Sequence, residues 1–166
     1  MTNPKIHGDT HEFVIEGPLD EKAPLFRHDL TGAQTLILDM KGLSFINSVG
    51  VTNWIQWAAK LPPGLKVKMR QCPMLLLNQL RNVHGFMPKG GVVESLQAPY
   101  VCPSCNAERT LLFEDGVHYG SGSAENPGKP FTRLPEPVDC PDCGDPMEED
   151  FIEHRLFGFL TLRRSS

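Results

Sequence analysis

The sequence lacks the long apolar runs of membrane proteins and of secreted precursors. No stretch of about 18 consecutive apolar residues occurs in the chain of 166 residues, so we predict no transmembrane helix. The N-terminal segment MTNPKIHGDTHEF has no apolar core of the signal-peptide kind, and we therefore expect a cytoplasmic protein. In a reducing cytoplasm, the five cysteines favour metal ligation or redox chemistry over structural disulfides.

The sequence also lacks the excess of positive charge that nucleic-acid-binding modules use. Its net charge is −4, and the two parts of the chain differ in sign. Residues 1–98 contain ten Lys and Arg against eight Asp and Glu, whereas residues 99–166 contain six against twelve. Because phosphate neutralisation requires basic side chains, the acidic second part makes DNA or RNA an unfavourable main partner.

The sequence does contain the composition of an ordinary globular protein, with 40% hydrophobic and 22% charged residues. Strand and helix patterns alternate through residues 1–98, which predicts an α/β domain with a partly parallel sheet. The predicted strands are HEFVIEGPLD, TLILDM, LKVKMR and GVVESL. A helix is predicted from Ser48 because apolar residues then recur at i, i+3, i+4 and i+7, and PMLLLNQLRNVHGF predicts a second helix.

Residues 99–166 form a different kind of segment. They contain two short strand-like stretches, RTLLFED and GVHYG, and a polar loop at about residues 120–130 that we expect to be flexible. The final stretch places four apolar side chains at helical spacing, and a strand is the alternative. These side chains belong to Ile152, Leu156, Phe159 and Leu160.

Two Cys-Pro-x-Cys pairs lie in this second part, Cys102 with Cys105 and Cys140 with Cys143. Two intervening residues let one tight turn present both sulfurs to a metal at about 2.3 Å, and two such turns complete a tetrahedral site of four thiolates. The 34 residues between the pairs exceed the usual spacing of about 15–20, but loop closure costs little more with length. We predict a zinc ribbon with one structural zinc ion.

Other interpretations of these residues stay open. A dithiol redox centre would use one Cys-Pro-x-Cys at a helix N-terminus, without a second pair to match it. His118 or His154 could replace one thiolate ligand, although ordinary polar roles are favoured for both. Cys72 has no partner at a useful spacing and is expected to pack as a small hydrophobic residue.

Three segments of residues 10–98 carry a family resemblance: VIEGPLDEKA, TLILDMKGLSFINSVGV and LKVKMRQCPMLLLNQLRNVHGF. In this order they resemble the first strand and Gly-x-Leu-Asp turn, the central strand and Asp-Ser-Ser-Gly loop, and the next strand and helix of STAS domains. That family comprises bacterial anti-sigma factor antagonists and cytoplasmic domains of sulfate transporters. The resemblance implies a mixed β-sheet with helices packed on one side, in a non-enzymatic signalling module that binds a protein partner.

The resemblance also implies a role for Ser48. In the antagonists of this family, the serine after an aspartate is phosphorylated by a partner kinase that is also the anti-sigma factor, and phosphorylation ends binding to that kinase. In INSVG, Ser48 matches the phosphoacceptor and Gly50 matches the glycine. Asn47 stands in place of the aspartate, and Val49 in place of the second hydroxyl residue.

From the residues alone, Ser48 has three possible roles. As the N-cap of the predicted helix it would contribute about 1 kcal/mol. As a phosphoacceptor it would hold its phosphate where the helix dipole and free N–H groups favour negative charge. The third role, that of a catalytic nucleophile, would require the flanking glycine of a nucleophile elbow and a histidine base, and the sequence shows neither. We therefore expect no catalytic residue and no enzyme.

The leading hypothesis is therefore a protein-binding signalling module whose contact residues include the loop 47–50 and the helix that follows. Trp54 lies on the apolar stripe of that helix and is expected in the core, whereas Trp57 lies at its margin and either packs or anchors a partner. Two alternatives from other classes stay open. They are a zinc-ribbon factor associated with transcription or nucleic acid, and a thiol redox enzyme.

Overall fold

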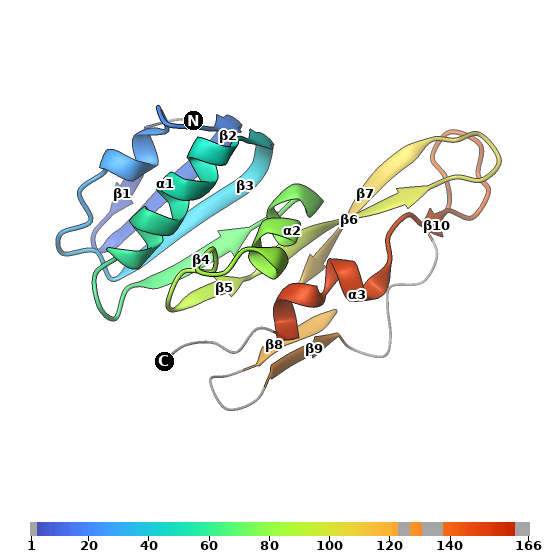
Figure 1. The fold of residues 1–166 in the computed structure, drawn as a ribbon. Coiled ribbons are helices and arrows are strands. Elements are labelled where there is room, and N and C mark those ends of the chain that lie inside the picture. The colour runs from blue at the N-terminus through green and yellow to red at the C-terminus, as the bar shows by residue number, and fades with distance from the viewer. Residues whose placement is uncertain (1–2, 123–126, 131–137, 162–166) are drawn as a thin grey trace.

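The main sheet contains five strands in the order β1-β2-β3-β4-β5 (Figure 1). The strands are β1 (Lys5–His7), β2 (Thr10–Leu19), β3 (Thr35–Ile46), β4 (Lys66–Arg70) and β5 (Gly91–Val93). β1 is antiparallel to β2, and the other neighbouring pairs are parallel. The computed structural model describes residues 3–122, 127–130 and 138–161. The order and directions of these strands confirm the prediction of an α/β fold with a mixed sheet.

Two helices connect the parallel strands, α1 (Ser48–Ala59) after β3 and α2 (Met74–Asn82) after β4. The chain steps from β3 to β4 to β5 in one direction across the sheet, so right-handed crossovers place both helices on the same face. Figure 1 accordingly draws both helices in front of the strands. Among the residues that the structure describes, none of the helices combines the length and apolar character needed to cross a membrane.

The core lies between this face of the sheet and the helices. Buried residues alternate with more exposed ones along β2, β3 and β4, as expected for a sheet with one covered face. Trp54 of α1 is fully buried, as predicted, and its ring stacks on Phe86 at a centroid distance of 5.0 Å. Its Nε1–H donates to the carbonyl of Phe86 at 2.6 Å, which satisfies the one polar atom of the indole.

A second sheet continues directly from the first. Its strands are β6 (Ser95–Val101), β7 (Glu108–Glu114) and β10 (Glu148–Glu149), in the antiparallel order β10-β6-β7. The backbone of Cys72, just after β4, donates to the carbonyl of Ser95 at 3.1 Å and accepts from the N–H of Gln97 at 2.9 Å. The two sheets are therefore joined along β6, and the predicted division at residue 98 falls inside this strand.

The polar loop predicted at about residues 120–130 overlaps two paired strands, β8 (Tyr119–Gly122) and β9 (Pro127–Pro130). Residues 123–126 lie outside the described residues. The ring of Tyr119 is fully buried, and its hydroxyl donates to the carbonyl of Val93 at 2.5 Å. This bond ties the start of the strand pair to β5.

The C-terminal stretch is helical, which was one of the two predicted alternatives. It forms the short helix α3 (Glu153–Leu156) and the 3-10 helix η2 (Gly158–Thr161). Three side chains of the predicted stripe are buried, those of Leu156, Phe159 and Leu160. Ile152 precedes the helix and is 51% exposed, so its assignment to the stripe is wrong. A Cβ on Gly158 would lie 2.2 Å from Cδ of Arg81, so this stretch packs closely on α2.

Candidate metal centre and Ser48 loop

The four paired cysteines form a single cluster. The sulfur atoms of Cys102, Cys105, Cys140 and Cys143 all lie within 4.8 Å of one another. The separation is 3.4 Å between Cys102 and Cys143 and 3.6 Å between Cys105 and Cys140. Four tetrahedral Zn–S bonds of about 2.3 Å would place the sulfurs about 3.8 Å apart. The cluster therefore has the size and the donor atoms to hold one metal ion, as the sequence predicts.

Two similar backbone turns position the thiols. In each turn, the first cysteine accepts a hydrogen bond at its carbonyl and donates one from its N–H. The four bonds run from Asn106 N–H to Cys102 O, Cys102 N–H to Ala107 O, Gly144 N–H to Cys140 O and Cys140 N–H to Asp145 O, at 2.7–2.8 Å. Asn106 and Gly144 have φ values of 60° and 80°, a conformation that Gly and Asn tolerate best. The duplicated sequence therefore produces a duplicated turn.

These turns also prepare one thiol for ionisation. Burial opposes the charged form of Cys140, but backbone N–H groups of Cys143 and Asp142 and the nearby thiols together lower its pKa to about 7, whereas the neighbouring thiols raise the pKa of Cys105 and of Cys143. A thiol that ionises near neutral pH is a ready metal ligand, because the thiolate is the form that binds metal. Four thiolates around one ion would leave no open position for water or substrate, which is the arrangement of a structural site.

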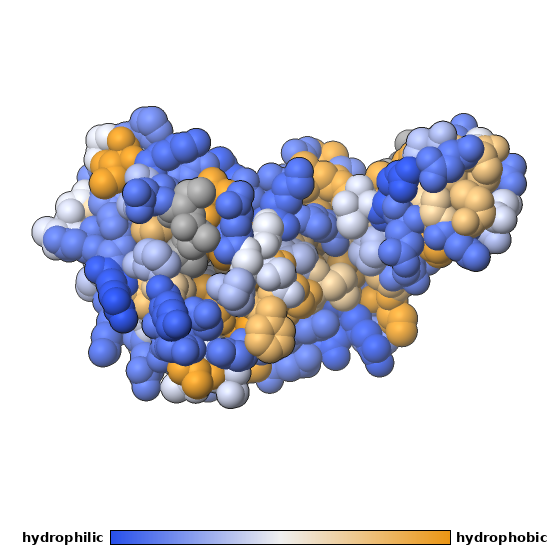
Figure 2. Space-filling view, turned by 90° about the horizontal axis from the view of Figure 1, so that it is seen from above, coloured by the Kyte–Doolittle hydropathy of each residue, from blue (hydrophilic) through white to orange (hydrophobic). Residues whose placement is uncertain are grey.

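We call residues 102–107 and 139–147 the cysteine tip. It lies at the far end of β6 and β7 from α1 (Figure 1), and Figure 2 shows it as a narrow lobe beside the larger body of the molecule. Its hydrophobic burial is small, because only Cys102, Cys140 and Met147 are buried within it. An ion pair at 3.0 Å joins Arg109 of β7 to Asp142 of the second turn.

The other candidate ligands do not join the cluster. Nδ1 of His118 accepts a hydrogen bond from the N–H of Glu114 at 2.9 Å, and its ring stacks on Phe113 at 5.0 Å. His154 lies on α3 with an exposed side chain. Cys72 is fully buried, and this burial raises the pKa of its thiol. It therefore behaves as the small hydrophobic residue that the sequence predicts.

The second candidate site is the Ser48 loop, which we define as residues 45–50 at the junction of β3 and α1. Asn47, not Ser48, caps the helix: its Oδ1 accepts from the N–H of Gly50 at 2.6 Å. The role of N-cap proposed for Ser48 is therefore wrong, because helical structure begins at Ser48 itself. The Ser48 side chain is exposed, and no described residue hydrogen-bonds its hydroxyl.

Gly50 fixes the position of this loop against β2. A Cβ at Gly50 would lie 2.0 Å from the carbonyl oxygen of Leu19, so no larger residue fits without moving one of the two chains. Gly50 is buried, and Asn47 is bound to its backbone. Both residues therefore shape the loop, whereas the side chains of Phe45, Ser48 and Val49 are exposed.

Phe45 is an exposed side chain that the sequence does not reveal. It is 58% exposed, and Val49 on the other side of Ser48 is 47% exposed. Strand alternation from the buried Leu43 would bury Phe45, but the pairing of β2 with β3 shifts here, with Gly17 opposite Leu43 and Pro18 opposite Phe45. This β-bulge places Ser44 between them and reverses the facing of the residues that follow.

Trp57, predicted among the partner-contacting residues, lies mostly inside the protein. Its side chain is 9% exposed, and its ring lies 5.0 Å from that of Trp54 and 6.2 Å from that of Phe26. Its main contribution is thus to core packing, and a partner could reach only a small part of the ring.

The chain was also compared with known proteins. No protein-family model, curated protein or solved structure matches it. The STAS resemblance of residues 10–98 therefore stays a prediction.

Proposed function

We propose that this chain is a non-enzymatic signalling protein that binds a protein partner through the Ser48 loop. One observation supports this most directly: Phe45, Ser48 and Val49 expose an aromatic ring, a hydroxyl and an aliphatic side chain over a backbone held by Asn47 and Gly50. Exposed apolar side chains on a fixed backbone are the usual anchors of protein interfaces. The loop also follows the carboxyl end of β3, where α/β proteins commonly bind their ligands.

Phosphorylation of Ser48 is the proposed control. The hydroxyl has no partner among the described residues and lies in the first turn of α1, which contains no acidic residue. A phosphate there would be stabilised by the helix dipole and free N–H groups, so the domain could accept it without unfolding. The same phosphate would add a charge of about −2 between Phe45 and Val49 and would oppose docking of an apolar partner surface. The resemblance to anti-sigma factor antagonists implies a kinase-like partner for this step.

The cysteine tip is proposed to hold one structural zinc ion. Four thiolates in tetrahedral reach of one another favour zinc over harder cations. The chain around the second turn is acidic, with seven Asp and Glu and no Lys or Arg in residues 138–153. This charge supports a protein contact more than a nucleic-acid contact.

The test is co-purification from the native host with the wild type, Ser48→Ala, Ser48→Asp and Phe45→Ser. We expect Ser48→Ala to retain the same proteins as the wild type, and both Ser48→Asp and Phe45→Ser to lose them. Gln56→Glu is a matched control, because it adds the same charge at an exposed position farther along α1. Equal yields from all variants would contradict the proposed interface, and loss with Phe45→Ser alone would contradict the phosphate switch.

A further inference from the structure

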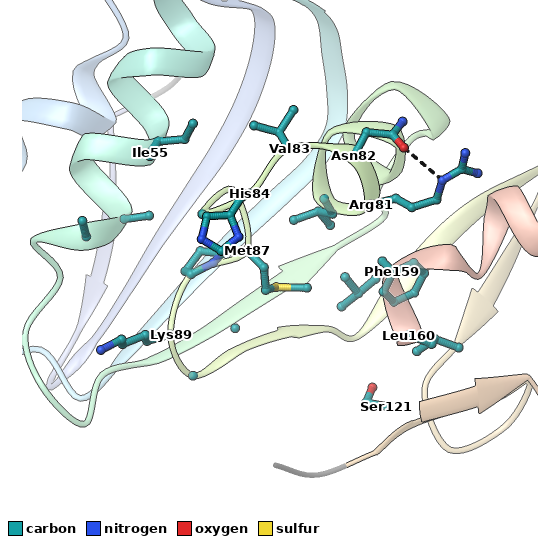
Figure 3. A pocket seen from close by; sticks show the side chains of 18 residues that line it. Ile55, Arg81, Asn82, Val83, His84, Met87, Lys89, Ser121, Phe159 and Leu160 are labelled. Atoms are coloured by element: carbon teal, nitrogen blue, oxygen red, sulfur yellow. Dashed lines mark hydrogen bonds between the residues drawn. The ribbon is translucent and has the colours of Figure 1, made fainter. Parts of the chain in front are cut away.

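A cavity of about 470 Å³ lies where the C-terminal stretch packs against the main domain (Figure 3). It is bounded by the last turn of α1, the end of α2, the segment from α2 to β5, and η2. Figure 3 shows His84 and Met87 on one side of this space and Phe159 and Leu160 on the other. Its volume falls in the range of about 300–1,000 Å³ that is typical of small-molecule sites. The cavity is formed by residues other than those of the Ser48 loop.

Much of the wall is apolar and comes from elements that are distant in the sequence. The apolar residues include Ile55, Ala58, Leu80, Val93, Phe159 and Leu160. Burial of a hydrocarbon group against such a wall contributes about 25 cal/mol for each Å² removed from water. The wall therefore suits a ligand with an apolar body.

The ionisable groups on the wall are all basic. Arg81, His84 and Lys89 line the cavity, whereas no Asp or Glu does so among the described residues. This is unusual in a chain that has 20 Asp and Glu against 16 Lys and Arg. A cavity with basic groups and no carboxylate attracts an anion and disfavours a cation.

Within the described part of the chain, two buried polar atoms of lining residues lack partners. Nη1 of Arg81 and Oγ of Ser121 have no hydrogen-bond partner among the described residues. The Nε–H of Arg81 donates to Oδ1 of Asn82 at 3.1 Å, and Figure 3 shows the guanidinium at the edge of the space, directed away from His84 and Met87. A buried donor without a partner costs free energy, and an anionic oxygen that met this group after the side chain turned toward the cavity would recover that cost.

We propose that this cavity binds an amphipathic organic carboxylate, with the apolar body against the wall and the carboxylate beside Arg81, His84 or Lys89. The apolar wall and the single sign of charge each exclude a class of ligand. A free inorganic anion would leave the wall unfilled, and an uncharged or cationic amphiphile would leave the basic groups without a partner.

Calorimetric titration of the whole 166-residue chain, loaded with zinc, with four probes tests the proposal. We expect decanoate to bind at one molecule per chain. Decanol, which lacks the charge, should bind at least about tenfold more weakly than decanoate, since a hydrogen bond to a charged group contributes about 1.5–3 kcal/mol. Decyltrimethylammonium and inorganic phosphate should not bind measurably at the same concentrations.

Substitutions of lining residues test whether decanoate binds in this cavity. Arg81→Gln should weaken decanoate binding about tenfold, and Lys89→Gln about two- to fivefold because Lys89 is exposed. Ala59→Leu should weaken binding by filling the cavity, and Ala59 is exposed, so this change does not depend on repacking of the core. Lys60→Gln is the control, because it removes a neighbouring charge that does not line the cavity.

Four results would overturn the proposal. Three of them are no heat of binding from millimolar decanoate, equal binding of decanol and decanoate, and equal effects of Lys60→Gln and Lys89→Gln. The fourth is phosphate that binds as tightly as decanoate, because the apolar body would then be unnecessary.

Discussion

The main sheet and the cysteine tip differ in how much apolar surface they bury. In the main sheet, side chains such as Phe13, Leu36, Leu38 and Met69 are fully buried beneath the helices. In the cysteine tip every residue other than Cys102, Cys140 and Met147 is exposed or half-exposed. A segment with so little apolar burial needs another source of stability. We therefore expect the main sheet to fold by hydrophobic burial and the tip to depend on the proposed metal ion.

The largest expected effect comes from removing the metal. One zinc per chain is expected in the purified protein, and chelation should unfold the cysteine tip, because structural zinc supplies about 10–16 kcal/mol of apparent binding free energy in small zinc domains. Elemental analysis measures the stoichiometry, and hydrogen exchange measures protection along residues 99–114. Protection in β2 and β3 should persist.

Single substitutions sharpen this result. Cys140→Ser should abolish stoichiometric zinc, whereas Cys72→Ala removes the fifth thiol and should leave it unchanged. A tip that stays protected after chelation, or a protein that cycles a dithiol reversibly, would favour the redox alternative.

The next largest effect is expected in the core of the main sheet. Trp54→Ala removes a fully buried indole and leaves the carbonyl of Phe86 without its hydrogen bond, so the free energy of unfolding should fall by about 3–5 kcal/mol. Urea unfolding followed by circular dichroism measures the loss, and Trp54→Phe should cost less. Zinc should remain bound at urea concentrations that unfold the mutant sheet. Release of zinc in the same transition would show that the two regions unfold as one unit.

A smaller effect separates structural from exposed residues within the Ser48 loop. Asn47→Ala removes the side chain that caps α1 and should cost about 1 kcal/mol of unfolding free energy. Ser48→Ala, one residue farther, should change it by less than about 0.5 kcal/mol, because the Ser48 side chain is exposed. Denaturant unfolding of the two variants is the measurement. A larger loss of unfolding free energy with Ser48→Ala than with Asn47→Ala would indicate that Ser48, and not Asn47, caps the helix.

Features with a local cause could be predicted from the sequence. The spacing within each Cys-Pro-x-Cys pair determines its turn, so the cluster of four thiols follows from the sequence once the two turns meet. Alternation in LKVKMR predicts β4, and the period of apolar residues predicts α1 and the buried Trp54. In each case, neighbours along the chain determine the outcome.

Features that depend on contacts between distant segments could not be predicted. The bulge that turns Phe45 outward arises from the pairing of β3 with β2. The cap at Asn47 depends on where α1 begins, and the first turn of α1 packs at Gly50 against Leu19 of β2, a segment distant in the sequence. The packing of Gly158 on Arg81, which encloses the basic cavity, joins segments that no local pattern connects.

The smallest expected effect is a pH dependence of the main sheet that involves two histidines. Nδ1 of His11 on β2 lies 2.8 Å from Nε2 of His28, which follows η1 (Pro24–Arg27). Burial, together with repulsion from His11, lowers the pKa of His28, and the nearby Asp29 only partly opposes this. The folded protein therefore binds a proton at His28 less readily than the unfolded chain does.

The sign of the effect follows from this difference. The stabilisation is fully present above the unfolded pKa of about 6.5, and it is lost as pH falls from there through the lower pKa of the folded state. Both tryptophans lie in α1, so urea titrations followed by fluorescence between about pH 7.5 and pH 5 report on the main sheet and not on the cysteine tip. His28→Gln should flatten this dependence, whereas His84→Gln, at an exposed position, should retain it. If His28→Gln left the slope unchanged, the acid sensitivity of the main sheet would have to come from groups outside this pair.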